Sequence, residues 1–292
     1  MFELVKTFQA HSNYVLGLAI TPDNSTLIST GMDNLIKYWK IPSYELLKTL
    51  EEHSKSVNSI SMATDGLKFA TSSTDLTAKV WDFSSGNVLH TIKGHKKTLI
   101  AAELSPDSKI IATGSYDGKI KLWNASDGSD LLTINAFERN VTSVRFSPDG
   151  KILIGGGLGD SFHLWKIHSG ELLKSVKEHK IVVSGARYTP DGKFFVSIGS
   201  ESLKIWNPKN WELLNTVQFE TKFPRPHVIS SDSKMIGIGF DYKVQIWNIN
   251  DGELLGTIEV KPKGVDSLCF SPDGKNLLMG AADKKIRIWK LE

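Results

Sequence analysis

Three sets of a histidine, a hydroxyl residue and an aspartate recur in the first half of the chain. They are His11, Ser29 and Asp33; His53, Thr71 and Asp75; and His95, Thr113 and Asp117. In serine hydrolases these residue types do nucleophilic chemistry, because the histidine takes the hydroxyl proton while the aspartate orients the imidazole. Here the set occurs three times at one spacing, whereas an active site is needed once, and the chain has no G-x-S-x-G motif. We therefore interpret the sets as structural groups that satisfy one another's buried polar atoms.

A tryptophan follows each set and belongs to a longer periodic series. The series is Trp39, Trp81, Trp123, Trp165, Trp206, Trp247 and Trp289, with separations of 41 or 42 residues. Each tryptophan closes a short run with apolar residues at every second position, which indicates a β-strand. A fixed period of about 40–45 residues is typical of a repeat fold, in which each unit is one small supersecondary structure. The sequence therefore predicts a small β-sheet that is repeated seven times.

Residues 98–134 show the repeated unit most clearly. We predict strands at 98–104, 109–115, 119–123 and 129–134. The first turn, Ser105-Pro106-Asp107-Ser108, combines a proline that fixes the backbone angle with an aspartate that bonds back to the backbone. Four antiparallel strands in each of seven units predict an all-β, seven-bladed propeller that forms a single domain over residues 1–292.

The two ends of the chain predict how the propeller closes. The fourth strand reads YELLKTL at 44–50, GELLKSV at 170–176, WELLNTV at 211–217 and GELLGTI at 252–258, but only three residues follow Trp289. A matching segment, FELVKTF, occupies residues 2–8. We expect residues 2–8 to form the outer strand of the last blade, which would protect an otherwise open sheet edge.

The spacing of the histidine, hydroxyl, aspartate and tryptophan residues resembles that of the WD40 repeat family, and the resemblance covers the whole chain. In that family the four side chains form a hydrogen-bonded tetrad within a blade: indole to hydroxyl, hydroxyl to imidazole, imidazole to carboxylate. The resemblance implies three complete structural tetrads. Their members are His11, Ser29, Asp33 and Trp39; His53, Thr71, Asp75 and Trp81; and His95, Thr113, Asp117 and Trp123.

The later repeats depart from this pattern. At the histidine, hydroxyl and aspartate positions, the fourth has Phe137, Gly155 and Gly159; the fifth has His179, Ser197 and, after loss of one residue, Ser200-Glu201; the sixth and seventh have no histidine, Gly237 with Asp241, and Met279 with Asp283. We expect blades four to seven to open more readily. The glycine run at 155–157 predicts close packing in blade four, and Pro224 and Pro226 predict a bulged or late-starting first strand in blade six.

The resemblance also implies where partners bind. In WD40 propellers the docking positions surround the channel mouth, flanking the first apolar residue of strand one and preceding the turn aspartate. The corresponding partner-binding candidates are Tyr14, Leu16, Met32, Asn58, Ile100, Tyr116, Asn140, Leu158, Phe223, Arg225, Phe240 and Asp266. Further positions of this kind are Ser56, Thr74, Thr98, Thr142, Val182, Ser184, Gly199, Gly264 and Ala282. Tyrosine, phenylalanine, methionine and arginine are enriched at protein interfaces, so the set favours docking; the alternative is that one or two of these side chains plug the channel.

Composition narrows the function further. The net charge is only +3 over 292 residues, so nucleic acid is not expected as a direct partner. Cys269 is the single cysteine, which excludes an intrachain disulfide and a four-cysteine zinc site. Residues 1–10 lack the apolar run of a signal peptide, and no stretch approaches the length of a membrane-spanning helix. We expect an intracellular, cytoplasmic protein, with the nucleus as the alternative location.

The sequence therefore predicts a non-catalytic scaffold that binds proteins or peptides, within a multiprotein complex and without cofactor or metal. One alternative is a reader of an acidic or modified peptide that uses Arg225 with Lys55, Lys96, Lys97 and Lys180. Another is a propeller enzyme, which would need acids or histidines gathered at the channel mouth. Asp266 is the only acid among the docking positions given above, so this alternative is the weaker one.

Overall fold

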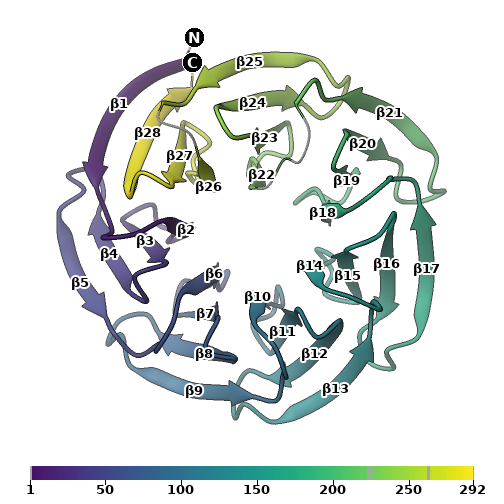
Figure 1. Cartoon of the computed structure of the whole chain (residues 1–292), viewed down its shortest axis with the longest axis horizontal. Helices are drawn as coiled ribbons and strands as arrows, with labels where there is room; N and C mark the ends of the chain where they lie inside the picture. Colours follow the sequence, from purple (N-terminus) through teal and green to yellow (C-terminus); the bar gives the residue numbers. More distant parts are fainter. Residues whose placement is uncertain (1, 222–223, 225, 262–263, 292) are drawn as a thin grey trace. The chain divides into compact units, whose positions relative to one another are not determined.

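The computed structural model describes residues 2–221, 224, 226–261 and 264–291. Over these residues the chain forms β-strands β1 to β28, arranged as seven four-stranded antiparallel sheets, and no helix (Figure 1). The predicted fold class, an all-β propeller with seven blades of four strands, is confirmed. In the described ranges no helix is long and apolar enough to cross a membrane.

The chain divides into two compact units, Met1–Asn58 with Pro224–Glu292, and Ser59–Phe223. We number the blades one to seven in the order of the periodic tryptophans. The first unit contains blades one, six and seven, and the second contains blades three, four and five with nearly all of blade two.

The blades of the first unit have the following strands. Blade one is β2 (Val15–Ile20), β3 (Thr26–Gly31), β4 (Ile36–Lys40) and β5 (Leu46–Leu50); blade six is β22 (His227–Ile229), β23 (Met235–Gly239), β24 (Lys243–Asn248) and β25 (Leu254–Glu259); blade seven is β26 (Val265–Phe270), β27 (Asn276–Ala281), β28 (Lys285–Leu291) and β1 (Phe2–Gln9).

The other four blades follow the same order. Blade two is β6 (Val57–Met62), β7 (Lys68–Ser73), β8 (Thr77–Asp82) and β9 (Val88–Lys93); blade three is β10 (Leu99–Leu104), β11 (Ile110–Ser115), β12 (Lys119–Asn124) and β13 (Asp130–Asn135); blade four is β14 (Val141–Phe146), β15 (Ile152–Gly157), β16 (Ser161–Lys166) and β17 (Leu172–Lys177); blade five is β18 (Val183–Tyr188), β19 (Phe195–Gly199), β20 (Ser202–Trp206) and β21 (Leu213–Gln218). The strands predicted for residues 98–134 agree with blade three to within a residue at each end.

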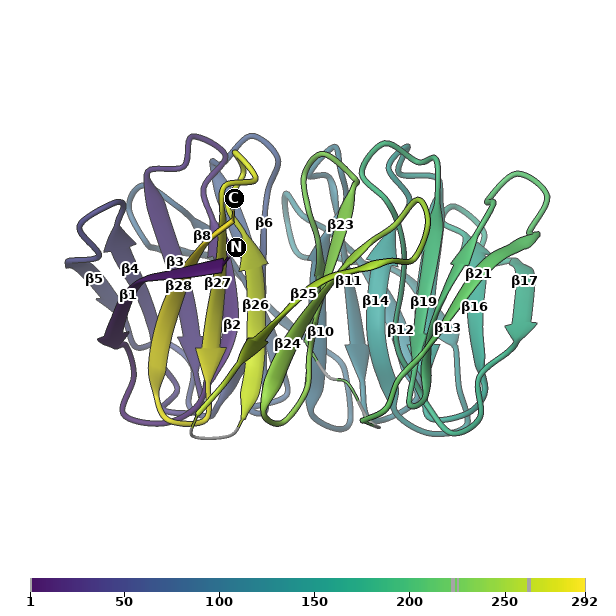
Figure 2. The same cartoon turned by 90° about the horizontal axis from the view of Figure 1, so that it is seen from above.

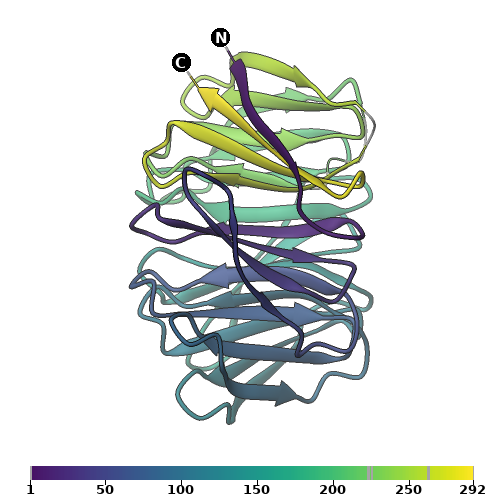
Figure 3. The ribbon, with the colours of Figure 1, turned by 90° about the vertical axis from the view of Figure 1, so that its left-hand side faces the viewer.

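The strand β1 closes blade seven as predicted. It pairs antiparallel with β28, from Phe2 opposite Leu291 to Gln9 opposite Lys285, with a register shift between Leu4 and Lys6. Figures 2 and 3 show β1, in purple, beside β28, in yellow. The segment at residues 2–8 thus lies in the fourth strand of blade seven, as expected.

The hydrophobic core lies between neighbouring blades. In the second unit, Ile120 and Leu122 of blade three form one buried cluster with Val141 and Val144 of blade four. In blade three the first and second strands are mostly buried, whereas the fourth strand, β13, exposes most of its side chains. The core therefore holds the blades face to face and leaves their fourth strands in solvent.

The turns form as the sequence predicts. Ser105 Oγ donates a hydrogen bond to Asp107 Oδ1 at 2.7 Å, and the Lys109 N–H donates to the same oxygen at 3.2 Å. Blade six has the predicted late start, because β22 begins only at His227 and has three residues. Phe223 and Arg225, which the sequence placed among the docking residues, lie outside the described residues.

Candidate functional site

Blades one and three contain complete tetrads. In blade one the Trp39 Nε1–H donates to Ser29 Oγ at 2.9 Å, His11 Nε2 lies 2.8 Å from the same hydroxyl, and His11 Nδ1 lies 2.8 Å from Asp33 Oδ1. One neutral tautomer satisfies all of these contacts, since a proton on Nδ1 bonds to the carboxylate while Nε2 accepts from the hydroxyl.

Blade three repeats the arrangement with a threonine. Trp123 Nε1 donates to Thr113 Oγ1 at 2.8 Å, His95 Nε2 lies 2.8 Å from that hydroxyl, and His95 Nδ1 lies 3.0 Å from Asp117 Oδ2. Ser29 and Thr113 are both buried, so neither hydroxyl faces solvent as a nucleophile would. The hydrogen bonds that the resemblance implies are therefore present in blades one and three.

The tetrads of blades two and five are less uniform. In blade two Trp81 Nε1 donates to Thr71 Oγ1 at 2.9 Å, and His53 is buried; the pairings of this imidazole stay a prediction. In blade five Trp206 Nε1 and His179 Nε2 both bond Ser197 Oγ, at 3.0 and 2.9 Å. Glu201 replaces the aspartate but reaches only to within 3.7 Å of His179 Nδ1.

Burial and hydrogen-bond partners shift the pKa values of several tetrad side chains. Burial raises the pKa of Asp33, but the His11 imidazole and the N–H groups of Ser12 and Leu35 outweigh it and bring this pKa down to about 2. Burial lowers the pKa of His95, which Asp117 opposes. Burial also lowers the pKa of His179, to about 4. His95 and His179 therefore remain neutral in the folded protein at pH 7, as a structural tetrad requires.

Blade four replaces the tetrad with aromatic packing. Phe137 stands in the histidine position, 6.3 Å from the Trp165 ring and 4.8 Å from the His163 ring between centroids. A Cβ on Gly155 would lie 2.8 Å from the Trp165 ring, and one on Gly157 would lie 2.5 Å from the Phe137 ring. The glycines are needed because the aromatic rings occupy the space of a side chain, which confirms the packing interpretation of the glycine run.

The strand register of blade six shows that the residue assigned from the sequence to the hydroxyl position was wrong. The register pairs Ile236 with Trp247, so Ile238, not Gly237, occupies the position that Ser197 holds in blade five. A Cβ on Gly237 would instead contact Phe270 and Leu277 of blade seven. The hairpin between β23 and β24 is one residue shorter than in blade one, and the preserved Asp241 concealed this deletion in the sequence.

Blade seven has a different substitute for the tetrad. Its register pairs Leu277 with Trp289 and Met279 with Arg287, so Met279 occupies the hydroxyl position as predicted. The carboxylate of Asp283 binds the Arg287 guanidinium, with Arg287 Nη1 at 3.1 Å from Oδ1, in place of an imidazole. Within the described ranges, the buried indole nitrogens of Trp247 and Trp289 have no hydrogen-bond acceptor. These two orphaned donors support the expectation that blades six and seven are less stable than blade three.

Supplying the acceptor missing from blade six should stabilise it. We expect Ile238→Thr to be more stable than Ile238→Val, by about 1 kcal/mol, because the hydroxyl would accept the Trp247 indole N–H and the two side chains have similar shape. The matched comparison in blade three is Thr113→Val, which removes an acceptor and should destabilise. Urea denaturation of the variants would measure this. If Ile238→Thr is the less stable of the pair, the hydroxyl is buried without a partner and Ile238 has been misassigned.

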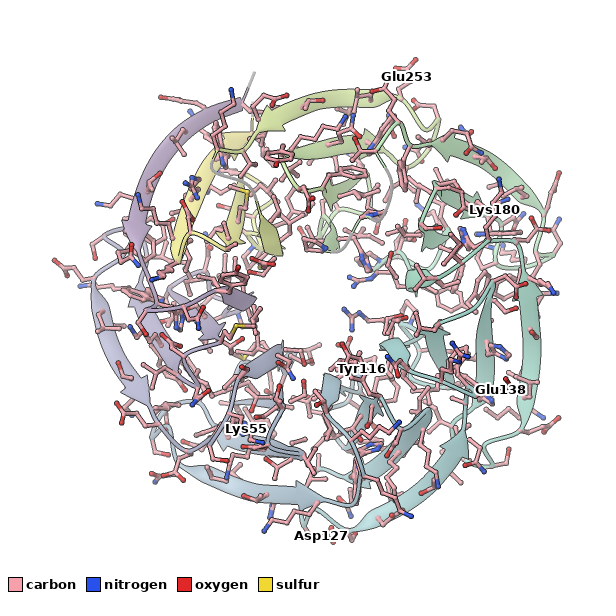
Figure 4. The ribbon with its side chains drawn as sticks, viewed as in Figure 1. Lys55, Tyr116, Asp127, Glu138, Lys180 and Glu253 are labelled. Atoms are coloured by element: carbon pink, nitrogen blue, oxygen red, sulfur yellow. The ribbon has the colours of Figure 1, made fainter. Side chains whose placement is uncertain are left out.

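The docking candidates lie at equivalent places in several blades. The residue before the turn aspartate, or before Gly159 in blade four, bonds through its N–H to the carbonyl of the residue before the first strand: Met32 to Tyr14 at 2.9 Å, Tyr116 to Thr98 at 3.0 Å, Leu158 to Asn140 at 3.0 Å and Ala282 to Gly264 at 3.0 Å. Tyr14 and Met32 in the first unit, and Tyr116 and Leu158 in the second, are each 41–42% exposed. Figure 4 shows Tyr116 near β10, at the opposite edge of blade three from Asp127.

The remaining candidates differ in exposure. Leu16, Asn58, Ile100, Asn140 and Asp266 are half-buried. Phe240 is only 3% exposed, so its predicted place as a docking residue exposed at the channel mouth is wrong. The β23–β24 hairpin is one residue shorter than in blade one, which changes the position that Phe240 takes. Gly199 is also misassigned, because a Cβ there would overlap the His179 ring, and the equivalent of Met32 in blade five is Ser200.

The sequence missed Ile181, which is 56% exposed and lies beside Leu158. The carbonyl of Ile181 accepts a hydrogen bond from the Gly159 N–H at 3.0 Å, and Val182 forms a bridge with Leu158. The signal available in the sequence was an apolar residue directly after Lys180, before the first strand of blade five. Among the residues that the structure describes, no group of three or more histidine, cysteine or acidic side chains is placed to hold a metal.

Repeated four-stranded blades held by histidine–hydroxyl–aspartate–tryptophan tetrads define a class of β-propeller built from sequence repeats. Six segments of the chain match the WD domain, G-beta repeat: residues 2–40, 44–82, 86–124, 128–166, 170–207 and 252–290. The protein therefore belongs to the WD40 family. The matched segments begin with a fourth strand, so each sequence repeat spans two blades, and β1 completes blade seven. No curated protein is significantly similar to the chain.

Proposed function

We propose that the protein is a non-catalytic scaffold that binds proteins or peptides at the residues that precede the turn aspartates and, in blade four, Gly159. WD40 propellers generally mediate protein–protein interactions and are typically non-enzymatic. The observation that carries the proposal is the pair Tyr116 and Leu158, which occupy equivalent positions on adjacent blades and leave about two fifths of each side chain exposed. Exposed apolar side chains grouped in this way are typical of interaction sites.

A second candidate function is recognition of an acidic peptide. Lys96, Lys97 and Lys180 are exposed, and the Lys97 carbonyl accepts a hydrogen bond from Ser115 Oγ at 3.0 Å, immediately before Tyr116 in the chain. A basic border around apolar anchors would attract an acidic segment, with an affinity that falls as salt is added. Lys55 lies in the other unit, and Arg225 lies outside the described residues.

The proposed setting is an intracellular, cytoplasmic multiprotein complex, with no cofactor and no direct contact with nucleic acid. The modest net charge of +3 supports a partner other than nucleic acid. An enzymatic role has less support, because the histidines and hydroxyls of blades one, three and five are already bonded to one another inside the blades.

The test is a double substitution, Tyr116→Ala with Leu158→Ala, in the full chain. Loss of an interface anchor costs roughly 2 kcal/mol or more, so we expect about 30-fold or greater weakening of partner binding with an unchanged melting temperature. The matched control is Leu131→Ala with Leu173→Ala, since these leucines are 51% and 43% exposed on the fourth strands of the same blades. Quantitative affinity purification of the three proteins would compare partner recovery. Equal recovery by the rim variant and the wild type would contradict the proposal.

A further inference from the structure

The first strands of blades three, four and five carry charged side chains at one equivalent position. The strands β10, β14 and β18 each have six residues, and the fifth is Glu103, Arg145 and Arg187 respectively. In β10 and β14 the second and fifth residues are half-buried while the other four are buried. Since β10 contacts β14 and β14 contacts β18, these three charged residues lie on neighbouring strands of the second unit (Figure 1).

The charges interact with one another. Arg145 Nη1 lies 3.3 Å from Glu103 Oε2 and donates a hydrogen bond to the Val144 carbonyl at 2.8 Å. Burial lowers the pKa of Arg187 to about 9; repulsion from Arg145 adds to this effect, and attraction to Glu103 opposes it. The two arginines therefore lie within electrostatic range of each other, and Arg187 stays protonated at pH 7.

Glu103, Arg145 and Arg187 form a row that has more positive than negative charge. Its three members provide two guanidinium groups and one carboxylate, and the equivalent residue of blade two, Ser61, is neutral and accepts a hydrogen bond from the Leu104 N–H at 3.1 Å. The second residues of the same strands, Ile100, Thr142 and Ser184, are uncharged. Two adjacent guanidiniums that repel each other are stabilised by an oxyanion, because a pair of its oxygens can accept the two parallel N–H bonds of a guanidinium.

We propose that Arg145 and Arg187 form an anion-binding site for a phosphate or carboxylate group, with Glu103 as an internal competitor for Arg145. The site lies three residues along β14 and β18 from Thr142 and Ser184, which were predicted as docking positions. It is therefore a separate, charge-selective site, and it does not depend on the docking positions of the proposed function.

The test measures inorganic phosphate and acetate binding to the full chain at constant ionic strength, by ³¹P line broadening for phosphate and by the shift in melting temperature for both. We expect a saturable response that Arg187→Gln weakens roughly tenfold, because each charged hydrogen-bonding group typically contributes this much. Glu103→Gln should strengthen binding several-fold, because it removes the competitor. Phosphate binding without acetate binding would assign the site to phosphate, and comparable binding of both would assign it to carboxylates as well.

The matched control is Arg139→Gln, which removes an exposed arginine of blade four and should leave phosphate binding unchanged. Arg145→Gln provides a second loss-of-charge variant if Arg187→Gln does not fold. No saturable response in the wild type would overturn the proposal. Equal weakening by Arg139→Gln and Arg187→Gln would also overturn it, as would Glu103→Gln without a gain.

Discussion

Replacing Asp117 with alanine should lower the free energy of unfolding by about 3 kcal/mol. The Asp117 carboxylate accepts hydrogen bonds from His95 Nδ1 at 3.0 Å, from the Lys96 N–H at 2.9 Å and from the Lys119 N–H at 3.0 Å. The imidazole is buried, so its N–H would lose its acceptor without gaining water, and an orphaned buried donor costs roughly 1–3 kcal/mol in addition to the lost backbone bonds. Urea denaturation at pH 7 would measure the difference.

The matched control is Glu201→Ala in blade five. Glu201 stands in the aspartate position but its Oε1 is 3.7 Å from His179 Nδ1, beyond hydrogen-bond distance. Removing it should cost less than about 1 kcal/mol, as for other weak, partly exposed pairs. If the two substitutions destabilise equally, the hydrogen bond to the imidazole is not what makes the tetrad stabilising.

Asp117→Ala should also change how the stability of the protein depends on pH in acid. Burial raises the pKa of Asp117, but the hydrogen bonds from the N–H groups of Lys96, His95 and Lys119 lower it by more. The pKa of Asp117 therefore lies below its ordinary value in the folded protein. A group with a lowered folded pKa stabilises fully above its unfolded pKa of about 4 and loses this contribution as the pH falls through the folded pKa. The stabilities of wild type and Asp117→Ala should therefore converge in strong acid.

The repeat period made most of the fold predictable. The tryptophan spacing and turn residues located the strands of blade three to within a residue, and the displaced copy at residues 2–8 revealed the pairing of β1 with β28. These inferences succeed because strand alternation and turn chemistry are local properties of the sequence.

Side-chain placement in the degenerate blades was less predictable. A one-residue deletion in a hairpin reverses which face each strand residue occupies, and the preserved Asp241 made blade six align one residue out of register. Ile238 and Gly237 were exchanged for this reason, and Phe240 was placed in solvent although it is buried. Arg145 and Glu103 pair across two neighbouring blades. Such a pair depends on the contact between blades, which the sequence of one repeat does not encode.

The second large effect is expected at the strand that joins the chain ends. Phe8 of β1 packs against Trp39 and Tyr44 of blade one, with ring centroids 4.9 and 5.6 Å apart. It also lies opposite Ile286 of β28, so one side chain links blade seven to blade one within the first unit. Phe8→Ala should lower the free energy of unfolding by about 3 kcal/mol, the lower end for a phenylalanine truncation, because the ring is only partly buried.

Hydrogen exchange would show where that loss acts. Without the Phe8 ring, β1 keeps its backbone pairing with β28 but loses its packing onto blade one, so amides of β1 should exchange faster while those of blade three stay unchanged. Val5→Ala is the matched control, since Val5 lies on the same strand with 54% of its side chain exposed and should cost little. Equal stability of the two variants, or unchanged exchange in β1, would mean that the backbone ladder alone holds the chain ends together. Faster exchange confined to β1 and β28 would instead show that the Phe8 contact with Trp39 and Tyr44 fastens the closing strand.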